Sequence, residues 1–267
     1  MRLITFDALR CLDIPDTHYI KPELMFRHKS EIKEADWILF PEYWQVNSLT
    51  YSLQKRIFPS LGSYHLGHDK IEMTRAFWAL CPENVPHTLI LPATPSSVEL
   101  VLDSFAFPFI AKEVRNSMGR GVHLMESRSD FDAYCRHNDV LYVQEYLPIK
   151  RDLRIVYVGE QIIGAYWRNG REGAYRNNVS QGGEIDYEDI PQAALDLVAR
   201  VAAALNVNHA GFDVAVMGDR YYLLEFNTLF GSEGLHRRNI SVGKHIWEFL
   251  RKNSPQPTIP PNLRLSA

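Results

Sequence analysis

The sequence has few cysteines, no long hydrophobic run and little net charge. Its three cysteines, Cys11, Cys81 and Cys135, lie far apart, which excludes the paired spacings of metal and redox motifs and fits free thiols in a reducing cytoplasm. No apolar run approaches the length of a membrane-spanning helix, and the N-terminal stretch MRLITFDALR lacks the apolar core of a signal peptide. A net charge of -3 gives no overall attraction for nucleic acid or for an anionic membrane. We therefore expect a cytoplasmic protein without nucleic-acid or membrane partners.

The composition is that of an ordinary globular protein. The 267 residues are 46% hydrophobic and 23% charged, which is enough for the core of one large domain or two smaller ones. Asp69 can cap a helix, and Ser96 with Glu99 forms a capping box ahead of another. In the first half, apolar patterns predict strands at residues 2–6, 37–41, 109–114, 122–125 and 141–147, and helices at residues 48–58, 67–80, 97–105 and 131–137.

The second half begins with two alternating apolar runs on either side of Gly159 and Glu160, which predict a β-hairpin. Beyond it, the patterns predict helices at 191–206 and 242–253 and strands at 211–217 and 220–227, followed by a poorly ordered proline-rich tail at 254–267. No internal repeat is present. The mixture of helices and strands predicts an α+β or α/β fold with many antiparallel strand pairs.

A basic, glycine-rich loop interrupts this pattern at residues 164–183, GAYWRNGREGAYRNNVSQGG. It holds five glycines, three arginines and three asparagines, without a helical or strand-like apolar period. A solvated loop needs none of these donors, and a core could not bury them without partners.

Asp213, Glu225 and Asn227 lie among apolar residues of two predicted strands. A two-residue loop at Gly218 and Asp219 would place Asp213 on the face opposite to the other two, whereas a three-residue loop at 217–219 would place all three on one face. We predict the three-residue loop. Oxygen ligands of this kind suit Mg²⁺ or Mn²⁺ better than zinc. The alternative is that they are ordinary polar residues on the solvated face of a sheet.

Lys112 lies on a predicted strand that leads into a glycine-containing loop at 116–121. Such a loop can direct several backbone N–H groups at a polyphosphate, with the lysine as a nearby point charge. It is neither a Walker motif nor a dinucleotide fingerprint, because no helix follows the glycines. A hairpin turn with a surface lysine is the alternative.

The strand end at Gln144, Glu145 and Tyr146 could lie along a purine, with backbone groups that read its edge. Asp152 and Arg154 share one face of the next strand, so Arg154 could meet the developing charge of a transferred phosphoryl group. The alternative for this segment is an ordinary connection between strands with a surface ion pair.

Taken in order, these segments resemble the ATP-grasp superfamily and, within it, the RimK-type glutamate ligases. The basic loop is similar to the pattern A-x-x-R-x-x-x-x-G-x-F/Y-R-x-N-x-x-x-G-G of that family. The matching residues are Ala165, Arg168, Gly173, Tyr175, Arg176, Asn178, Gly182 and Gly183. The resemblance covers residues 35–251. It implies an α+β (α/β) ATP-grasp fold of two α+β subdomains that clasp ATP, at 67–147 and 148–253, after a shortened N-terminal α/β domain at 1–66.

The resemblance also implies a ligand set. Lys70 and Lys112 would contact ATP phosphates, Gln144, Glu145 and Tyr146 would lie near adenine, and Asp152 would lie near the ribose. Arg176, Asn177 and Asn178 would line the nucleotide and the reaction centre, with Arg154, Arg168 and Arg176 as the catalytic arginines. Two Mg²⁺ ions, or Mn²⁺, would be held by Asp213, Glu225 and Asn227.

The implied activity is that of an ATP-dependent carboxylate–amine ligase that acts through an acyl phosphate. It would add an amino acid such as glutamate to a protein, peptide or small-molecule acceptor, and would be a homo-oligomer. The family carries His-Arg where this chain has Ser180 and Gln181, which removes a bidentate grip on a carboxylate. The alternative function is a non-catalytic ATP-binding regulatory or scaffold protein that keeps the same fold.

Overall fold

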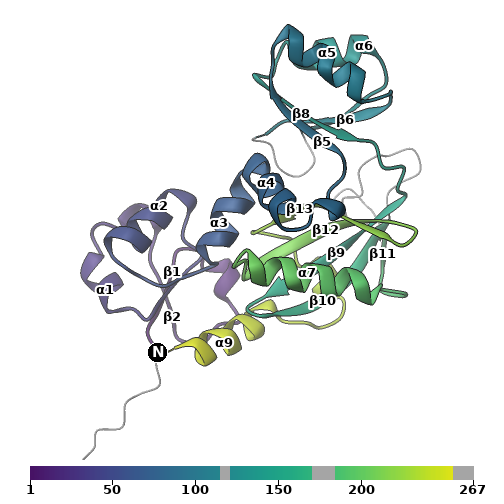
Figure 1. Ribbon diagram of the computed structural model, residues 1–267. Coiled ribbons are helices and arrows are strands. Elements are labelled where there is room, and N and C mark those ends of the chain that lie inside the picture. Colours follow the sequence, from purple (N-terminus) through teal and green to yellow (C-terminus); the bar gives the residue numbers. More distant parts are fainter. Residues whose placement is uncertain (115–120, 170–183, 255–267) are drawn as a thin grey trace, which may run out of the picture. The chain divides into compact units, whose positions relative to one another are not determined.

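The computed structural model describes residues 1–114, 121–169 and 184–254 (Figure 1). The predicted tail beyond residue 254 and most of the basic loop therefore lie outside the described residues. The chain forms two compact units, one of residues 1–58 with the C-terminal segment from Ser241, and one of residues 59–240. No helix of the described part is long and apolar enough to cross a membrane.

The first unit is built on a parallel sheet with the strand order β2-β1-β3-β4. Its strands are short and end in loops. They are β1 (Leu3–Thr5), β2 (Thr17–Tyr19), β3 (Trp37–Leu39) and β4 (Ile57–Phe58), and the helical segments are η1 (Leu9–Cys11), η2 (Pro22–Leu24), α1 (Lys29–Glu34), α2 (Tyr43–Asn47), η3 (Ser48–Ser52) and α9 (Val242–Asn253). The C-terminal helix α9 belongs to this unit because Phe249 packs on Trp37 and Phe58, with ring centroids 6.1 and 5.7 Å apart.

The predicted helix at 48–58 is helical only over Ser48–Ser52 and is wrong beyond it. A single π-helical turn, η3, follows α2 directly, and the chain then extends into β4. Ile57 and Phe58 are buried beside β3, so the apolar pair at the end of this segment serves the sheet rather than a helix face.

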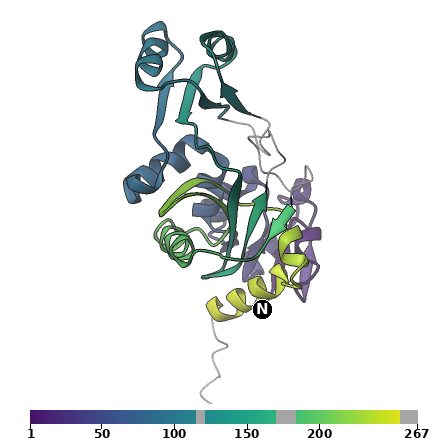
Figure 2. The ribbon, with the colours of Figure 1, turned by 90° about the vertical axis from the view of Figure 1, so that its right-hand side faces the viewer.

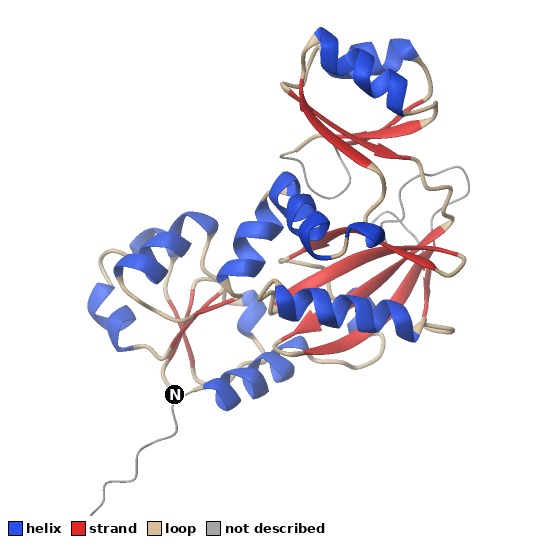
Figure 3. Ribbon diagram, viewed as in Figure 1, coloured by secondary structure: helices blue, strands red, loops and turns tan. Residues whose placement is uncertain are grey.

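The second unit begins with α3 (Leu61–His68) and α4 (Lys70–Leu80), then η4 (Pro82–Asn84). Asp69 caps α4 as predicted, since its carboxylate accepts the N–H groups of Ile71 and Glu72. An antiparallel sheet of order β5-β8-β6-β7 follows, with α5 (Pro95–Ser104) and α6 (Arg128–Cys135) on one face (Figure 3). The strands are β5 (Thr88–Pro92), β6 (Phe109–Lys112), β7 (Val122–Met125) and β8 (Val140–Glu145). Alternation directs Lys112, Tyr142 and Gln144 away from these helices.

The helix α5 begins earlier than the predicted capping box implied. Thr94 is the N-cap, and its hydroxyl accepts the Ser97 N–H at 3.2 Å, while Pro95 occupies the first helical position, where its missing N–H costs nothing. Ser96 therefore lies inside the first turn and does not cap it.

Replacing Thr94 by alanine should lower the free energy of unfolding by about 1 kcal/mol, because the Ser97 N–H loses its acceptor. Urea unfolding of the two single variants Thr94→Ala and Ser96→Ala measures this. Ser96→Ala is the matched control and should change stability by less than about 0.5 kcal/mol. A larger loss of stability in Ser96→Ala than in Thr94→Ala would instead identify Ser96 as the cap.

The larger sheet of the second unit is antiparallel throughout, with the order β11-β10-β9-β12-β13. Its strands are β9 (Arg151–Val158), β10 (Gln161–Asn169), β11 (Glu184–Asp186), β12 (His209–Met217) and β13 (Arg220–Asn227), and its helices are α7 (Gln192–Ala204) and α8 (Glu233–His236). Helices α4 and α7 cover one face and build a core with the inward residues of the strands (Figure 2). The hairpin at Gly159 and Glu160 is confirmed.

Candidate functional site

Two β-bulges set which side chains reach the face of the large sheet that α7 leaves uncovered. Ile163 is the extra residue between β10 and β9, and Leu224 is the extra residue between β13 and β12. The predicted three-residue loop is wrong, because Met217 pairs with Arg220 and only Gly218 and Asp219 turn. The bulge at Leu224 nevertheless places Asp213 opposite Glu225, so both carboxylates lie on one face as predicted.

The pairing creates a row of polar side chains across four strands. Tyr166 lies opposite Arg154, Arg154 opposite Asp213, and Asp213 opposite Glu225. A neighbouring row ends in Gly211 and Asn227. Because adjacent strands are about 4.8 Å apart, the first row extends over about 14 Å of one sheet face.

Four of the side chains on this face form a buried ion-pair cluster. Arg154 Nε lies 2.7 Å from Asp213 Oδ1, and Arg168 Nη2 lies 3.0 Å from the same oxygen. Arg168 Nε donates to Asp152 Oδ1 at 2.6 Å, and Arg154 Nη2 donates to Asp213 Oδ2 at 3.2 Å. Two guanidinium groups and two carboxylates thus balance in charge. Burial raises the pKa of Asp152 to about 6, although the Arg168 charge opposes the rise.

Gly211 provides the space that Arg154 occupies. A Cβ atom at this position would clash with Arg154 Nη1 and would lie 2.9 Å from Phe230 Cβ. The glycine therefore leaves room for the Arg154 side chain over β12.

The residues of the candidate metal site fit an oxygen-binding divalent ion. Asp213 Oδ1 is buried and already lies 2.7 Å from Arg154 Nε and 3.0 Å from Arg168 Nη2, so a divalent ion would share this carboxylate with the two guanidinium groups. Asn227 Nδ2 donates to Glu225 Oε1 at 3.2 Å, which leaves the amide oxygen of Asn227 and the second oxygen of Glu225 for coordination. Within the described ranges no three His, Cys, Asp or Glu side chains gather, so Asn227 would be the third ligand.

Lys112 is a buried cation near this face. It is 7% exposed, and its Nζ lies 5.5 Å from the centroid of the Tyr142 ring. Burial lowers the pKa of Lys112 to about 8, while the charges of Glu225 and Asp213 raise it and Lys70 lowers it further. The charges of Lys70, Asp213 and Glu225 thus act on Lys112, as expected if the predicted phosphate ligands and the predicted metal ligands belong to one site.

The predicted adenine segment has its side chains engaged within the small sheet. Gln144 Nε2 donates to Thr88 Oγ1 at 2.8 Å, and Glu145 Oε1 accepts the His87 N–H at 2.6 Å. Tyr146 is half-buried beyond the end of β8. A purine at this segment would therefore meet its backbone rather than the side chains of Gln144 and Glu145. Arg176, Asn177 and Asn178 lie outside the described residues.

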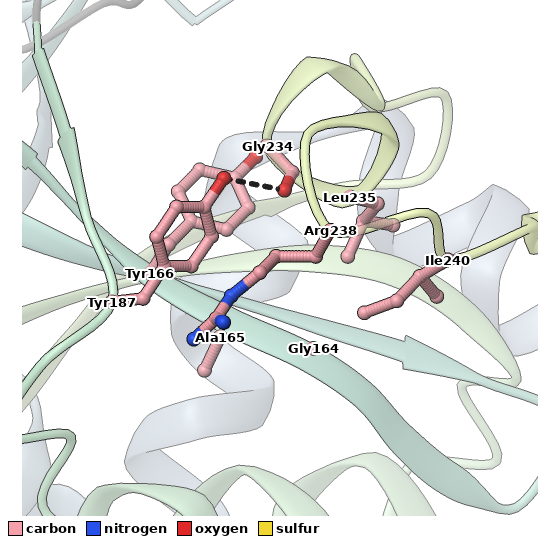
Figure 4. A pocket seen from close by; sticks show the side chains of 8 residues that line it. All are labelled: Gly164, Ala165, Tyr166, Tyr187, Gly234, Leu235, Arg238 and Ile240. Carbon is pink, nitrogen blue, oxygen red and sulfur yellow. Dashed lines mark hydrogen bonds between the residues drawn. The ribbon is translucent and has the colours of Figure 1, made fainter.

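A pocket of about 380 Å³ lies on the same sheet face, at the β10 end of the polar row. Figure 4 shows its lining, in which the Tyr187 hydroxyl donates to the Gly234 carbonyl at 2.7 Å and the Arg238 guanidinium lies 4.5 Å from the Tyr187 ring centroid. The full lining is Gly164, Ala165, Tyr166, Tyr187, Gly234, Leu235, Arg238 and Ile240. Sequence reasoning missed this pocket. The alternation of Gly164, Tyr166 and Arg168 indicates that they share one face of a strand. Nothing in the sequence links them to Tyr187 or Arg238.

The chain is similar in sequence to curated ligases. A curated "Probable alpha-L-glutamate ligase" of Enterobacter sp. (strain 638) is 29% identical over 196 residues, which are 68% of this chain and 65% of that protein. The "Ribosomal protein bS6--L-glutamate ligase" of Escherichia coli O139:H28 is 27% identical over 195 residues, with the same shares of the two chains. The matched region thus spans slightly less than two thirds of the length of these relatives.

The fold has a close counterpart among solved structures. The RimK domain protein ATP-grasp of Sphaerobacter thermophilus DSM 20745 superposes with a TM-score of 0.70 at 16% identity, over 94% of this chain and all of that one. The two antiparallel sheets of the second unit are therefore those of the ATP-grasp fold. The family model of the RimK-like ATP-grasp domain matches residues 76–250, so the chain belongs to the RimK-like ATP-grasp family.

Proposed function

We propose that the protein is an ATP-dependent carboxylate–amine ligase that forms an amide bond through an acyl phosphate. The observation that carries the proposal is the row Arg154–Asp213–Glu225 on one sheet face, with Asn227 beside it and Lys112 within electrostatic reach. Such a face combines oxygen ligands for a divalent ion with cations for phosphate groups, which phosphoryl transfer requires.

In the first step, an oxygen of the acceptor carboxylate attacks the γ-phosphorus of ATP, the bond to the β,γ-bridging oxygen breaks, and ADP leaves. In the second step, the neutral amine of an amino acid attacks the acyl carbon, and the carbon–oxygen bond to phosphate breaks. The proton that the amine loses passes to the phosphate, so the products are an amide and hydrogen phosphate. Both steps conserve the redox state, so no further co-reactant is needed.

The chain's own residues would supply charge and position. Lys112 and Lys70 would bind phosphate oxygens, and Arg154 would face the phosphoryl group whose charge spreads during transfer. Asp213 would hold Arg154 and Arg168 in place and, with Glu225 and Asn227, would bind Mg²⁺. The metal, when bound, would neutralise charge on the phosphates. Arg176, Asn177 and Asn178 stay candidates for the same centre.

The names of the relatives support an amino-acid substrate, with glutamate as the first candidate, and a protein or peptide as the acceptor. A small-molecule acceptor is the second candidate, because the chemistry is the same and only the pocket differs. We also propose that the protein is a homo-oligomer, which sedimentation of the purified protein would test.

The test is release of ADP from Mg-ATP by the purified protein with each of the twenty amino acids. The assay is run with and without a cell extract freed of small molecules, and products are identified by mass spectrometry. Amino-acid-dependent ADP release with a matching mass gain on an acceptor is expected. Tight binding of ATP without turnover under every condition would favour the non-catalytic ATP-binding protein instead.

The pH dependence of ATP binding is expected to report on Lys112. In the protein without ATP, the pKa of Lys112 is lowered to about 8, so the lysine loses its charge above that pH. Bound phosphates would keep it protonated. The complex then holds more protons than the free protein, so affinity for ATP should fall as pH rises above about 8, by at most about tenfold per pH unit. Calorimetric titration with a non-hydrolysable ATP analogue measures this.

The control is Lys112→Met, whose weaker affinity should lack this pH dependence. An unchanged slope in the variant would assign the titration to another group and would remove Lys112 from the phosphate site.

A further inference from the structure

We propose that the pocket beside β10 binds the amino-acid substrate and that Arg238 holds its α-carboxylate. The inference rests on the proposed function and names which part of the sheet face receives the amine donor. It begins from a chemical requirement. An amino acid brings its own carboxylate to a site that phosphorylates carboxylates, so this group has to be held away from the γ-phosphate while the amine faces the acyl carbon.

The pocket lies at the correct end of the sheet face for this task. Tyr166, which lines it, lies opposite Arg154 on the next strand, and Arg154 lies opposite Asp213. Two strand spacings therefore separate the Tyr166 backbone from that of Asp213, about 10 Å. A small molecule in the pocket can reach the row formed by Arg154, Asp213 and Glu225, yet it does not occupy the proposed metal site.

Arg238 is oriented by an aromatic support. Its guanidinium lies 4.5 Å from the centroid of the Tyr187 ring, and the Tyr187 hydroxyl is itself fixed by its bond to the Gly234 carbonyl (Figure 4). A guanidinium that rests on a ring keeps its N–H groups directed outward in the plane. These donors match the two oxygens of a carboxylate.

The charge of Arg238 is also uncompensated within the described part of the chain, where no ion pair involves it. Its neighbour Arg237 forms one with Glu233 in the same turn. Both arginines are exposed, but Arg237 has a carboxylate partner on the protein, whereas Arg238 lines the pocket. An anionic ligand would supply the missing partner for the charge of Arg238, and the tyrosine side chains of the pocket would contact the carbon chain of the ligand.

The volume of about 380 Å³ suits a ligand of this size, because it lies at the lower end of the range for small-molecule sites. A grip on the α-carboxylate also fixes the amine, since both groups share one carbon atom. The site would therefore select an α-amino acid by its backbone and leave the side chain to the open part of the pocket.

The test is direct binding of amino acids by calorimetry, with a non-hydrolysable ATP analogue and Mg²⁺ present, so that turnover is not needed. Each of the twenty L-amino acids is titrated into the wild type. The one that binds most tightly is then compared with its α-carboxamide, which for L-glutamate is L-isoglutamine. The same titrations are made with Arg238→Gln and with the matched control Arg237→Gln.

The proposal predicts that Arg238→Gln weakens amino-acid binding by about 10- to 100-fold, as expected for loss of a charge-assisted pair. The α-carboxamide should bind the wild type with a similar loss and should bind Arg238→Gln no worse than the acid does. Arg237→Gln should bind like the wild type, and the affinity for the ATP analogue should stay within about twofold in both variants.

The proposal would be overturned by equal binding to wild type and Arg238→Gln, by an equal loss in Arg237→Gln, or by failure of the wild type to bind any of the twenty amino acids. A selective loss of affinity for the ATP analogue in Arg238→Gln would also overturn it, because Arg238 would then hold phosphate. Binding of an amino acid without ADP release in the turnover assay would support the proposed pocket and would contradict the proposed ligase activity.

Discussion

Replacing Asp213 by asparagine should reduce amino-acid-dependent ADP release by at least about 100-fold, the scale seen when one charged or oriented group is lost from a reaction centre. The change keeps the size of the side chain and removes one negative charge. Asp213 contacts both Arg154 and Arg168 and is a proposed metal ligand, so two roles are lost together. Initial rates of ADP formation at saturating Mg-ATP measure the effect.

The same variant should also be less stable, because two buried guanidinium groups would face one remaining carboxylate, that of Asp152. Glu225→Gln separates the two effects, since Glu225 lies in the same row but pairs with neither arginine of the cluster. It should lose activity with a smaller change in melting temperature. The control is Asp219→Asn in the exposed turn of the same hairpin. Full activity of both Asp213→Asn and Glu225→Gln would remove this row from the chemistry.

Replacing Gly211 by alanine is expected to lower the rate of ADP formation by about 10- to 100-fold, because displacement of a positioned group by about 1 Å has effects of that size. The added methyl group would clash with Arg154 Nη1 and would lie 2.9 Å from Phe230 Cβ, so it would be too close to both side chains. Arg154 would have to leave its place beside Asp213. Steady-state rates and the affinity for the ATP analogue should be measured together, since loss of rate with retained affinity points to Arg154.

The matched control for this change is Gly231→Ala, because a Cβ atom at Gly231 meets no other atom within 4 Å. Its activity should equal that of the wild type. If Gly211→Ala is as active as Gly231→Ala, then the location of Arg154 over β12 does not matter for the reaction.

The sequence predicted that Asp213, Glu225 and Asn227 share a face, but through the wrong loop. The turn at Gly218 and Asp219 has two residues, as expected where a glycine adopts a positive φ, here 58°. Only the bulge at Leu224 corrects the register. A bulge depends on how both strands pack, and no local residue pattern near Leu224 specifies it.

The bulge at Ile163 has the same consequence on the neighbouring strand. Without it, the confirmed two-residue turn at Gly159 and Glu160 would place Arg168 opposite Arg151 and direct it into the core face. With it, Arg168 lies opposite Asp152 and joins the ion-pair cluster. The arginines could be named from the sequence, but their common face depends on packing of the sheet.

Elements with a clear apolar pattern were predictable, including the four-residue strand β7 at its predicted bounds 122–125, and elements without one were not. Helix α9 has the predicted bounds 242–253, and the capping role of Asp69 is confirmed. The helix α3 and the edge strand β5 were missed. Helix α3 has only a weak amphipathic pattern, and β5 ends in a proline and has an apolar run too short to distinguish from a loop.

The central claim is that a carboxylate is activated by phosphate on the face formed by Arg154, Asp213 and Glu225. It is tested most directly by following the oxygen atoms. The acceptor identified by mass spectrometry is labelled with ¹⁸O in its reacting carboxylate, and the inorganic phosphate released during amide formation is analysed by mass spectrometry. The account predicts one labelled oxygen in each phosphate, because the acyl carbon–oxygen bond breaks when the amine attacks. Phosphate without the label would contradict an acyl phosphate and, with it, the proposed role of this face.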